Sequence, residues 1–398
     1  MKTITGSVTA PQGFIANGVK SGIKKGKLDL ALIVSKVPAL AAGVFTTNEL
    51  KAAPLKVSKA HIKNGRAQAI VINSGNANCL TGKSGLKAAI DIAKAISKSL
   101  WISEDDVLVA STGLIGKPLP TGKIKSAIAK LVKGLSKAKE LKAAQAILTT
   151  DTRPKRIAVA INIGKKTVKL GGIAKGAGMI CPNMATMLCF LTTDANIGLR
   201  ALRRSLRDSV ESSFNTITVD GDMSTNDMVL ILANSLAGGP EIRYLSREHR
   251  IFSDALNYVT SYLAKEIVRG GEGATKFIEV NVKGSRSLSD AKRMAKQIAN
   301  SNLVKTAIAG EDPNIGRIAS AAGASGVKFD ESKLDIYLNR IKIVDGGNVI
   351  DKVRPKIRRS LRKREIIITL DLNCGSNSAA SWTCDLTEEY IKINARYN

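Results

Sequence analysis

Histidine is almost absent from this 398-residue sequence, which has only His61 and His249. Both lie in polar segments, KAHIKNG and SREHRIF, and are expected at the surface. A Ser-His-Asp triad or a Cys-His dyad needs a histidine that a third group orients, and neither segment contains a residue pattern that indicates such a group. If the protein is an enzyme, its general base must be another kind of group.

Cysteine is also scarce, and its spacing is uninformative for metal binding. The five cysteines form no C-x-x-C pair, and their number is odd. A disulfide framework or a zinc site is therefore not expected, and we predict no metal. The pattern is typical of buried thiols in a reducing compartment, so a cytoplasmic location is predicted.

The sequence has no run of 18 or more apolar residues, so no membrane span is expected. Its first residues, MKTITGSVTAPQGF, lack the apolar stretch of a secretory signal. Aromatic residues make up only 4% of the chain, against 44% for all hydrophobic residues, which indicates an aliphatic core.

Acidic residues are few, and the formal net charge of +28 raises the question of nucleic acid. Residues 1–185 have 30 basic and 8 acidic residues, a balance of +22, and the lysines are scattered along helical segments. No aromatic residues interleave with them, and no helix-turn-helix or RNP signature is present. The one dense run, RPKIRRSLRKR at 354–364, is typical of a solvated surface segment. We therefore predict no nucleic-acid partner.

Apolar runs of strand length alternate with helical periodicity along the whole chain, which predicts an α/β fold of two to three domain-sized layers. Expected strands are 30–34, 69–72, 107–110, 157–161, 187–191, 228–232, 277–282, 305–308, 334–338 and 366–370. Expected helices are 84–100, 121–143, 199–215, 253–268 and 287–300.

The segment KGAGMICPNMATMLCF, from Lys175 to Phe190, begins as a glycine-rich loop and ends as a buried strand. Thr186 stands at the junction, after the small residue Ala185. A threonine freed at a new N-terminus can use its own α-amine as a base, because that amine has a pKa of about 7.7–8.0. Two alternatives stay open: a plain loop threonine beside a strand, and Cys181 as nucleophile, although no histidine is near to activate it.

Polar residues follow several expected strands. In STGLIG, Thr112 and Gly113 follow a strand directly, where a hydroxyl and a backbone N–H could donate to an oxyanion or simply form a turn. Similar clusters are VINSGNANCLTG, VDGDMSTNDM, RGGEGATK and GEDPNIGR. Such clusters suggest a shared binding surface or ordinary turns. Asp220 and Asp222 resemble a metal site only weakly, since no third ligand is evident.

These motifs together resemble the ornithine acetyltransferase family, the glutamate N-acetyltransferases of arginine biosynthesis. KGAGMICPNMATMLCFLTTDA resembles the family's self-cleavage segment, and the likeness covers essentially the whole chain. It includes DLALIVSKVPALAAGVFTTNELKAAPLKVSK, LTTDTRPK, TVDGDMSTNDMVLILAN and EEYIKINARY. The resemblance implies a layered α/β sandwich related to the N-terminal nucleophile enzymes.

The resemblance also implies site residues. Self-cleavage between Ala185 and Thr186 would leave an α chain, 1–185, and a β chain, 186–398, which would assemble as α2β2. Thr186 would then carry acetyl from N-acetylornithine to glutamate, with no cofactor. Thr112 and Gly113 match the family's oxyanion-hole pair. The positions that match substrate-binding residues are Thr149, Lys175, Thr186, Glu272 and Asn394.

The sequence departs from the family at its end. Members commonly continue past the final tyrosine to a Ser or Thr that touches substrate, whereas this sequence stops at Asn398. Monofunctional and bifunctional members share these motifs, so use of acetyl-CoA as a second donor stays open. A self-processing aminopeptidase of related fold is the alternative function, since the same nucleophile could pass its acyl group to water.

Overall fold

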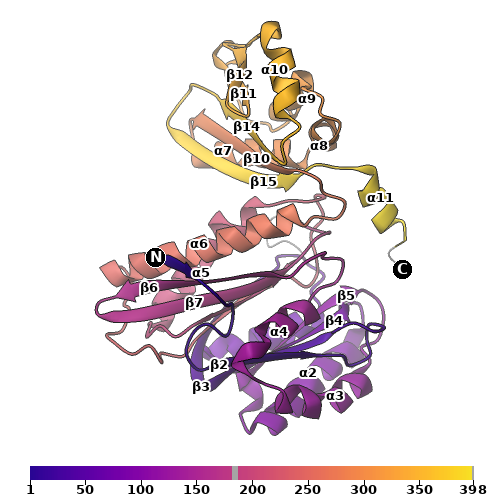
Figure 1. Cartoon of the computed structure of the whole chain (residues 1–398), viewed down its shortest axis with the longest axis vertical. Coiled ribbons are helices and arrows are strands. Elements are labelled where there is room, and N and C mark those ends of the chain that lie inside the picture. The colour runs from indigo at the N-terminus through magenta and orange to yellow at the C-terminus, as the bar shows by residue number, and fades with distance from the viewer. Residues whose placement is uncertain (182–186, 397–398) are drawn as a thin grey trace. The chain divides into compact units, whose positions relative to one another are not determined.

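The computed structural model describes residues 1–181 and 187–396. The chain folds into two compact units, shown in Figure 1. Unit 1 contains Met1–Met179, the described residues of Asn183–Asn215, and Met223–Ile267. Unit 2 contains Ile180, Cys181, Thr216–Asp222 and the described residues from Val268 onward. This division differs from the segments 1–185 and 186–398, which are expected cleavage products and not folding units.

Unit 1 is built on one mixed sheet. Within the described residues nine strands take part, in the order β1-β6-β7-β8-β9-β3-β4-β5, with β2 paired to β3. The pairs β4–β5 and β8–β9 are parallel, and the other neighbours are antiparallel. The strands are β1 Lys2–Ile4, β2 Phe14–Val19, β3 Leu30–Phe45, β4 Arg66–Asn76, β5 Val107–Leu114, β6 Lys155–Ile163, β7 Lys166–Lys175, β8 Leu188–Thr193 and β9 Met228–Ala233.

Both faces of this sheet are buried, and the alternation along β3 shows why. Leu30 and Leu32 pack on one face, in a core with helices α2 and α3, while Ala31 and Ile33 pack on the other, in a core with α4. A strand covered on both sides reads as a continuous apolar run, which is how LALIV was recognised. The helices of unit 1 are α1 Ala53–His61, α2 Gly82–Leu100, α3 Thr121–Lys133, α4 Glu140–Ala146, α5 Leu199–Ser212 and α6 Arg247–Arg269.

Unit 2 has a second sheet of six strands within the described residues, in the order β13-β12-β11-β14-β10-β15. Its strands are β10 Phe277–Ser285, β11 Asp335–Leu338, β12 Ile341–Asp345, β13 Asn348–Val349, β14 Glu365–Asp371 and β15 Asn377–Cys384. Ile278, Val280 and Val282 of β10 point into a core shared with helix α7. The helices are α7 Leu288–Asn300, α8 Asn302–Ala309, α9 Ile315–Gly323, α10 Arg354–Ser360 and α11 Glu388–Asn394.

The α/β prediction is confirmed, and most expected strands lie in the two sheets, but three details were wrong. Residues 305–308 belong to helix α8, because Val304, Ala307 and Ile308 are buried at helical spacing. The helix expected over 121–143 ends at Lys133, and Ser136 pairs with Ala16 instead. His249 is buried, with Nε2 3.0 Å from Ser205 Oγ.

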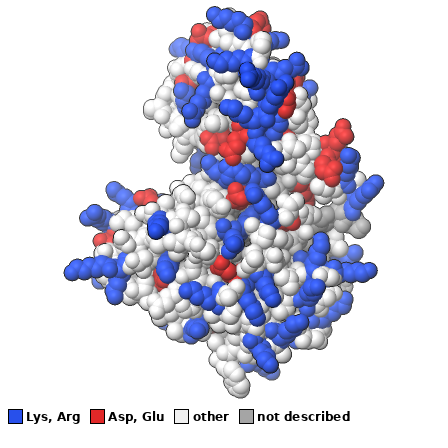
Figure 2. All heavy atoms as spheres, in the orientation of Figure 1, with Lys and Arg blue, Asp and Glu red and all other residues white. Residues whose placement is uncertain are grey.

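The basic side chains are distributed widely. Figure 2 shows lysine and arginine spread over the visible face of both units and not gathered in a single stripe. Across residues 1–181 and 187–396, no helix is both long and apolar enough to span a bilayer.

Strand β8 makes a testable prediction about chain association. It lies between β7, from the segment before the expected cleavage site, and β9, from the segment after it, and β9 also pairs with β3. A cut after Ala185 would leave both pairings and their buried side chains in place. We expect the two chains to co-elute in size-exclusion chromatography under native conditions and to separate in denaturant. Native separation would contradict this.

Candidate active site

Thr112 and Gly113 were expected directly after a strand, but they lie inside β5, just before its end. The pairing of the parallel strands β4 and β5 becomes irregular there, and this irregular strand end at Gly113 is the Thr112–Gly113 turn. Thr112 is opposite Ser74, and Gly113 is opposite Gly75. Gly113 has a φ of 131°, and a Cβ there would lie 2.3 Å from the carbonyl carbon of Gly75. Only glycine fits this backbone and this close approach. The turn is therefore held rigidly, with Thr112 only 6% exposed.

Lys175 brings a buried ammonium group to this turn. It is the last residue of β7, is 3% exposed, and donates from Nζ to Thr112 Oγ1 at 3.3 Å. A buried lysine is costly unless it has polar partners or an anionic ligand. Lys175 also lowers the pKa of Asp151 and opposes the raised pKa of Asp227, so its ammonium group lies near two buried carboxylates as well as Thr112.

The Asp151 carboxylate ties Thr149 and Lys175 into one network. Oδ1 accepts from Gly176 N at 2.7 Å and from Lys155 Nζ at 2.5 Å, and Oδ2 accepts from Thr149 N at 3.2 Å. The Asp151 and Lys155 side chains are both fully buried. Burial by itself raises the pKa of Asp151, but the ammonium groups of Lys155 and Lys175 and the Gly176 N–H outweigh it and lower that pKa to about 2. Asp151 is thus a charged anchor for both segments.

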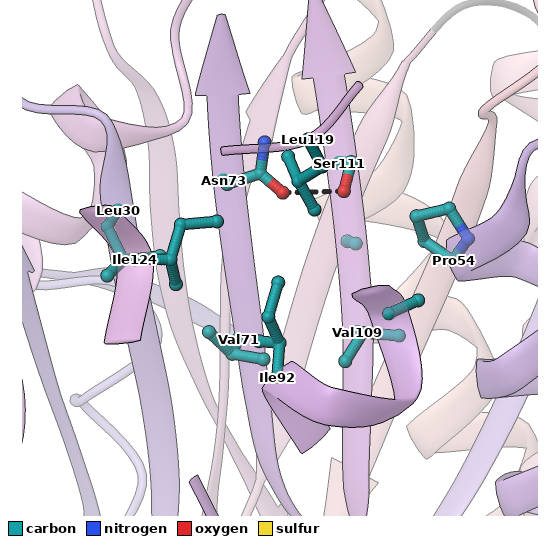
Figure 3. A pocket seen from close by; sticks show the side chains of 11 residues that line it. Leu30, Pro54, Val71, Asn73, Ile92, Val109, Ser111, Leu119 and Ile124 are labelled. Carbon is teal, nitrogen blue, oxygen red and sulfur yellow. Dashed lines mark hydrogen bonds between the residues drawn. The ribbon is translucent and has the colours of Figure 1, made fainter. Parts of the chain in front are cut away.

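Three of the polar strand-end clusters do converge in unit 1. Asn226 Nδ2 donates to Ala77 O at 2.7 Å and to Ser111 O at 2.8 Å. The segment STND, residues 224–227, therefore holds the ends of both β4 and β5. Ser111 Oγ donates to Asn73 Oδ1 at 2.6 Å, the dashed contact in Figure 3. The cavity drawn there is apolar and only about 10 Å³ in volume, too small for a substrate. It shows how the strands are packed around Asn73 and Ser111.

Asp227 is a site residue that sequence reasoning missed. It is 1% exposed, and its Oδ1 accepts a hydrogen bond from Met187 N at 2.8 Å. Met187 is the first described residue after the expected cleavage site. Asp227 Oδ2 has no hydrogen-bond partner among the described residues. Burial raises the pKa of Asp227 well above its usual value, although Met187 N–H and Lys175 oppose this. Asp227 is therefore harder to ionise than an exposed carboxyl group, and it holds Met187 through its acceptor oxygen. Ala185 and Thr186 themselves lie outside the described residues.

Glu272 and Asn394 are brought together in unit 2. Asn394 Nδ2 donates to Glu272 Oε2 at 2.8 Å, and Glu272 is 7% exposed. The loop that carries Glu272 packs on helix α11, because Thr387 Oγ1 donates to Gly273 O at 2.7 Å. The two residues are 122 positions apart in the sequence, and the family resemblance alone had assigned both to substrate binding.

Other candidates from the sequence have structural partners. Asp220 accepts from Ile180 N at 2.8 Å and from Tyr390 Oη at 3.2 Å, and Asn314 caps α9 by accepting from Arg317 N. Burial raises the pKa of the Cys181 thiol, which makes it a poorer nucleophile. Within residues 1–181 and 187–396, no group of three His, Cys, Asp or Glu side chains could hold a metal ion.

Comparison with known proteins identifies the class. The ArgJ family profile matches residues 15–398. Relatives named arginine biosynthesis bifunctional protein ArgJ are 48% identical in Symbiobacterium thermophilum, over 400 residues, and in Staphylococcus epidermidis, over 398 residues; each match covers 100% of both chains. The fold and these matches define an acyltransferase of arginine biosynthesis. The chain belongs to the ArgJ family.

Solved structures give a weaker likeness. An ornithine acetyltransferase from Mycobacterium tuberculosis, solved with ornithine, is 39% identical, and the match covers 46% of this chain and 98% of that one. An aminopeptidase from Ochrobactrum anthropi described as a variant of the Ntn hydrolase fold is 11% identical, over 68% of this chain and 89% of that one. The TM-score is 0.43 in both cases, too low to carry an argument about the site.

The raised pKa of Asp227 makes a prediction about pH and stability. Its pKa is raised in the folded state, so the folded protein binds the proton more tightly than the unfolded chain does. Stability is therefore lost as pH rises above about 4, by at most about 1.4 kcal/mol per pH unit, until the folded pKa is passed. Asp227→Asn resembles the neutral acid and has no such loss.

We expect the melting temperature of Asp227→Asn, relative to wild type, to rise with pH from about pH 4 until the folded-state pKa of Asp227 is passed. Asp222→Asn is the matched control, because Asp222 is an exposed acid in the same polar segment. A difference between Asp227→Asn and wild type that does not change with pH would show that Asp227 is ionised throughout.

Proposed function

We propose that this protein transfers an acetyl group from N-acetylornithine to glutamate through an acetyl ester on Thr186. The observation that carries the proposal is that buried Lys175 donates to Thr112 and also pairs in the sheet with Leu188, the residue after Met187. The turn offers a hydroxyl and a backbone N–H for a developing oxyanion. Met187 follows directly on the residue that must supply the nucleophile.

Maturation comes first in this mechanism. The Thr186 hydroxyl attacks the Ala185 carbonyl carbon, the C–N bond breaks, and the Thr186 amine leaves with the hydroxyl proton. Water then hydrolyses the resulting ester and releases the Ala185 carboxylate. The freed α-amine has a reference pKa of about 7.7–8.0, so it can serve as general base near neutral pH without a histidine.

Each turnover then uses the same hydroxyl. Thr186 Oγ attacks the acetyl carbonyl of N-acetylornithine, and ornithine leaves after its α-nitrogen takes up a proton. The glutamate amine then attacks the acetyl ester, and N-acetylglutamate departs as the hydroxyl is restored. Both steps pass through a tetrahedral oxyanion, which Thr112 and the Gly113 N–H would stabilise. A covalent intermediate shared by two substrates predicts ping-pong kinetics.

Substrate recognition is divided between the remaining positions. Lys175 pairs with a substrate carboxylate, and Glu272, held by Asn394, pairs with a substrate amine. Thr149 lies near Lys175 because Asp151 accepts from Thr149 N and from the N–H of Gly176, the residue after Lys175. We further propose an α2β2 assembly of the cleaved chains in the cytoplasm, with no cofactor; acetyl-CoA would be a second donor if the protein is bifunctional.

A self-processing aminopeptidase would use the same nucleophile but pass the acyl group to water. The two functions differ in whether N-acetylornithine consumption depends on glutamate. Supplying purified protein with glutamate and either N-acetylornithine or acetyl-CoA separates three activities in one assay. These are acetyl transfer from N-acetylornithine, acetyl transfer from acetyl-CoA, and release of the acyl group to water.

The central prediction concerns Thr186. Thr186→Ala removes the hydroxyl, so the protein should stay a single chain and transfer no acetyl group, whereas Thr186→Ser should still cleave. N-terminal sequencing of the wild-type β chain should read TMLCF. N-acetylornithine alone should add one acetyl group to that chain by intact mass, and glutamate should remove it. Acetyl found on Cys181, or a Thr186→Ala protein cut after Ala185, would refute the mechanism.

A second prediction tests whether one oxyanion site serves both reactions. Thr112→Ala should slow self-cleavage and acetyl transfer alike, by about 100- to 1,000-fold, because one donor is lost from both tetrahedral states. Cleavage is followed by gel electrophoresis and transfer by product formation. Thr121→Ala, at the half-buried first position of helix α3, is the control that should leave both rates unchanged. Slow maturation with normal turnover would show that two separate sites are used.

A further inference from the structure

Lys24 lies on a loop that is fixed against the strand ends of unit 1. The buried carboxylate of Asp29 accepts from the backbone N–H groups of Ser21, Gly22 and Lys24, at 2.5, 3.1 and 2.9 Å. The backbone oxygen of Asp29 also accepts from Ser74 N at 2.8 Å, at the end of β4. The loop therefore has a defined conformation in which Lys24 is half-buried, whereas its neighbour Lys25 is exposed.

The aliphatic stem of Lys24 covers the glycine behind the Thr112–Gly113 turn. A Cβ on Gly75 would lie 2.8 Å from Lys24 Cγ, and Gly75 is the residue that Gly113 approaches closely from the neighbouring strand. Lys24 thus packs directly on the backbone pair that forms the candidate oxyanion turn.

The ammonium group of Lys24 reaches the segment that carries Thr149. Nζ donates to Leu148 O at 2.7 Å, one peptide unit before Thr149. Thr149 and Gly176 share the carboxylate of Asp151, and Lys175 precedes Gly176. Lys24 is therefore tied to the same network as Thr149 and Lys175, although nothing in the sequence analysis singled it out.

The charges around Lys24 do not favour an ammonium group. Burial lowers its pKa to about 8, and Lys27 on its own loop and Lys175 on β7 act in the same direction. Asp29 and Asp151 oppose this, but both carboxylates already accept several hydrogen bonds. Lys24 and Lys175 lie near enough for the charge of Lys175 to disfavour that of Lys24, and an anionic ligand beside both ammonium groups would favour the charged form of each.

We propose that Lys24 is a substrate-binding residue, whose ammonium group acts with that of Lys175 to hold a substrate carboxylate beside the Thr112–Gly113 turn. This deepens the proposed function and rests on it, because both proposed substrates are carboxylates. N-acetylornithine and glutamate share an α-carboxylate, while glutamate has a second carboxylate on its side chain. The kinetics of the two substrates decide between these groups.

The test compares Lys24→Met with Lys25→Met, each made as a single substitution in the self-cleaved enzyme. Methionine keeps the apolar stem over Gly75 and removes only the charge and its donors. A lost charge-assisted contact corresponds to about a tenfold to a hundredfold rise in KM, with kcat little changed. Lys25→Met should have wild-type constants, and Lys24→Arg should recover most of the affinity. A rise for both substrates assigns the α-carboxylate, and a rise for glutamate alone assigns the side-chain carboxylate.

A pH profile separates binding from a merely structural role. In the wild type, kcat/KM for N-acetylornithine should fall above pH 8, as Lys24 loses its proton and the bound carboxylate loses a partner. Lys24→Gln can still donate to Leu148 O but has no charge to lose, so its KM should be raised and flat from pH 7 to pH 9.5. The gap between the two proteins should narrow as pH rises.

The outcomes are distinct. An active wild type with unchanged KM and pH profile in Lys24→Met and Lys24→Gln would overturn the role of Lys24 and leave the proposed function standing. A loss of kcat without a change in KM would do the same, because it would assign Lys24 to positioning of the turn. A wild type that transfers no acetyl group would overturn the proposed function and this inference together.

Discussion

The ion pair between Asp151 and Lys155 is the constraint on which the site in unit 1 depends. Both side chains are fully buried, and a buried pair that loses one partner is strongly destabilised because the other charge is left alone. The same carboxylate accepts from Gly176 N and Thr149 N, so the ends of β7 and of the preceding loop are held by one charge. The position of Lys175 at Thr112, and that of Lys24 on Leu148, follow from this anchor.

The nine-stranded sheet explains how a chain could be cut at its centre and stay folded. The expected cleavage site lies just before β8, which has β7 on one side and β9 on the other. Hydrogen bonds and apolar contacts across these pairs do not require a continuous backbone. A peptide bond just before a central strand can therefore be lost without exposing the core, while Met187 at the start of the second chain stays buried.

Much of the fold could be predicted because its signals are local. Runs such as LALIV and VLILA are long, apolar and bounded by turn residues, and they do form central strands. The errors arose where tertiary packing decided. Lys305 was taken for part of a strand, but its ammonium group is buried against Thr383 and the chain around it is helical. His249 was expected at the surface, but Ser205 gives it a partner inside unit 1.

The sequence by itself determined the family, through motifs that match ArgJ. It also led to the proposed chemistry, through the near absence of histidine and a threonine after a small residue at a glycine-rich junction. These are properties of residue type and order. Only the tertiary structure decided which side chains share charges and hydrogen bonds. Asp227 on Met187, Glu272 on Asn394 and Lys24 on Leu148 join residues 40 to 124 positions apart. Such contacts depend on strand register and burial, which bring distant segments together and leave no periodic signal in the chain.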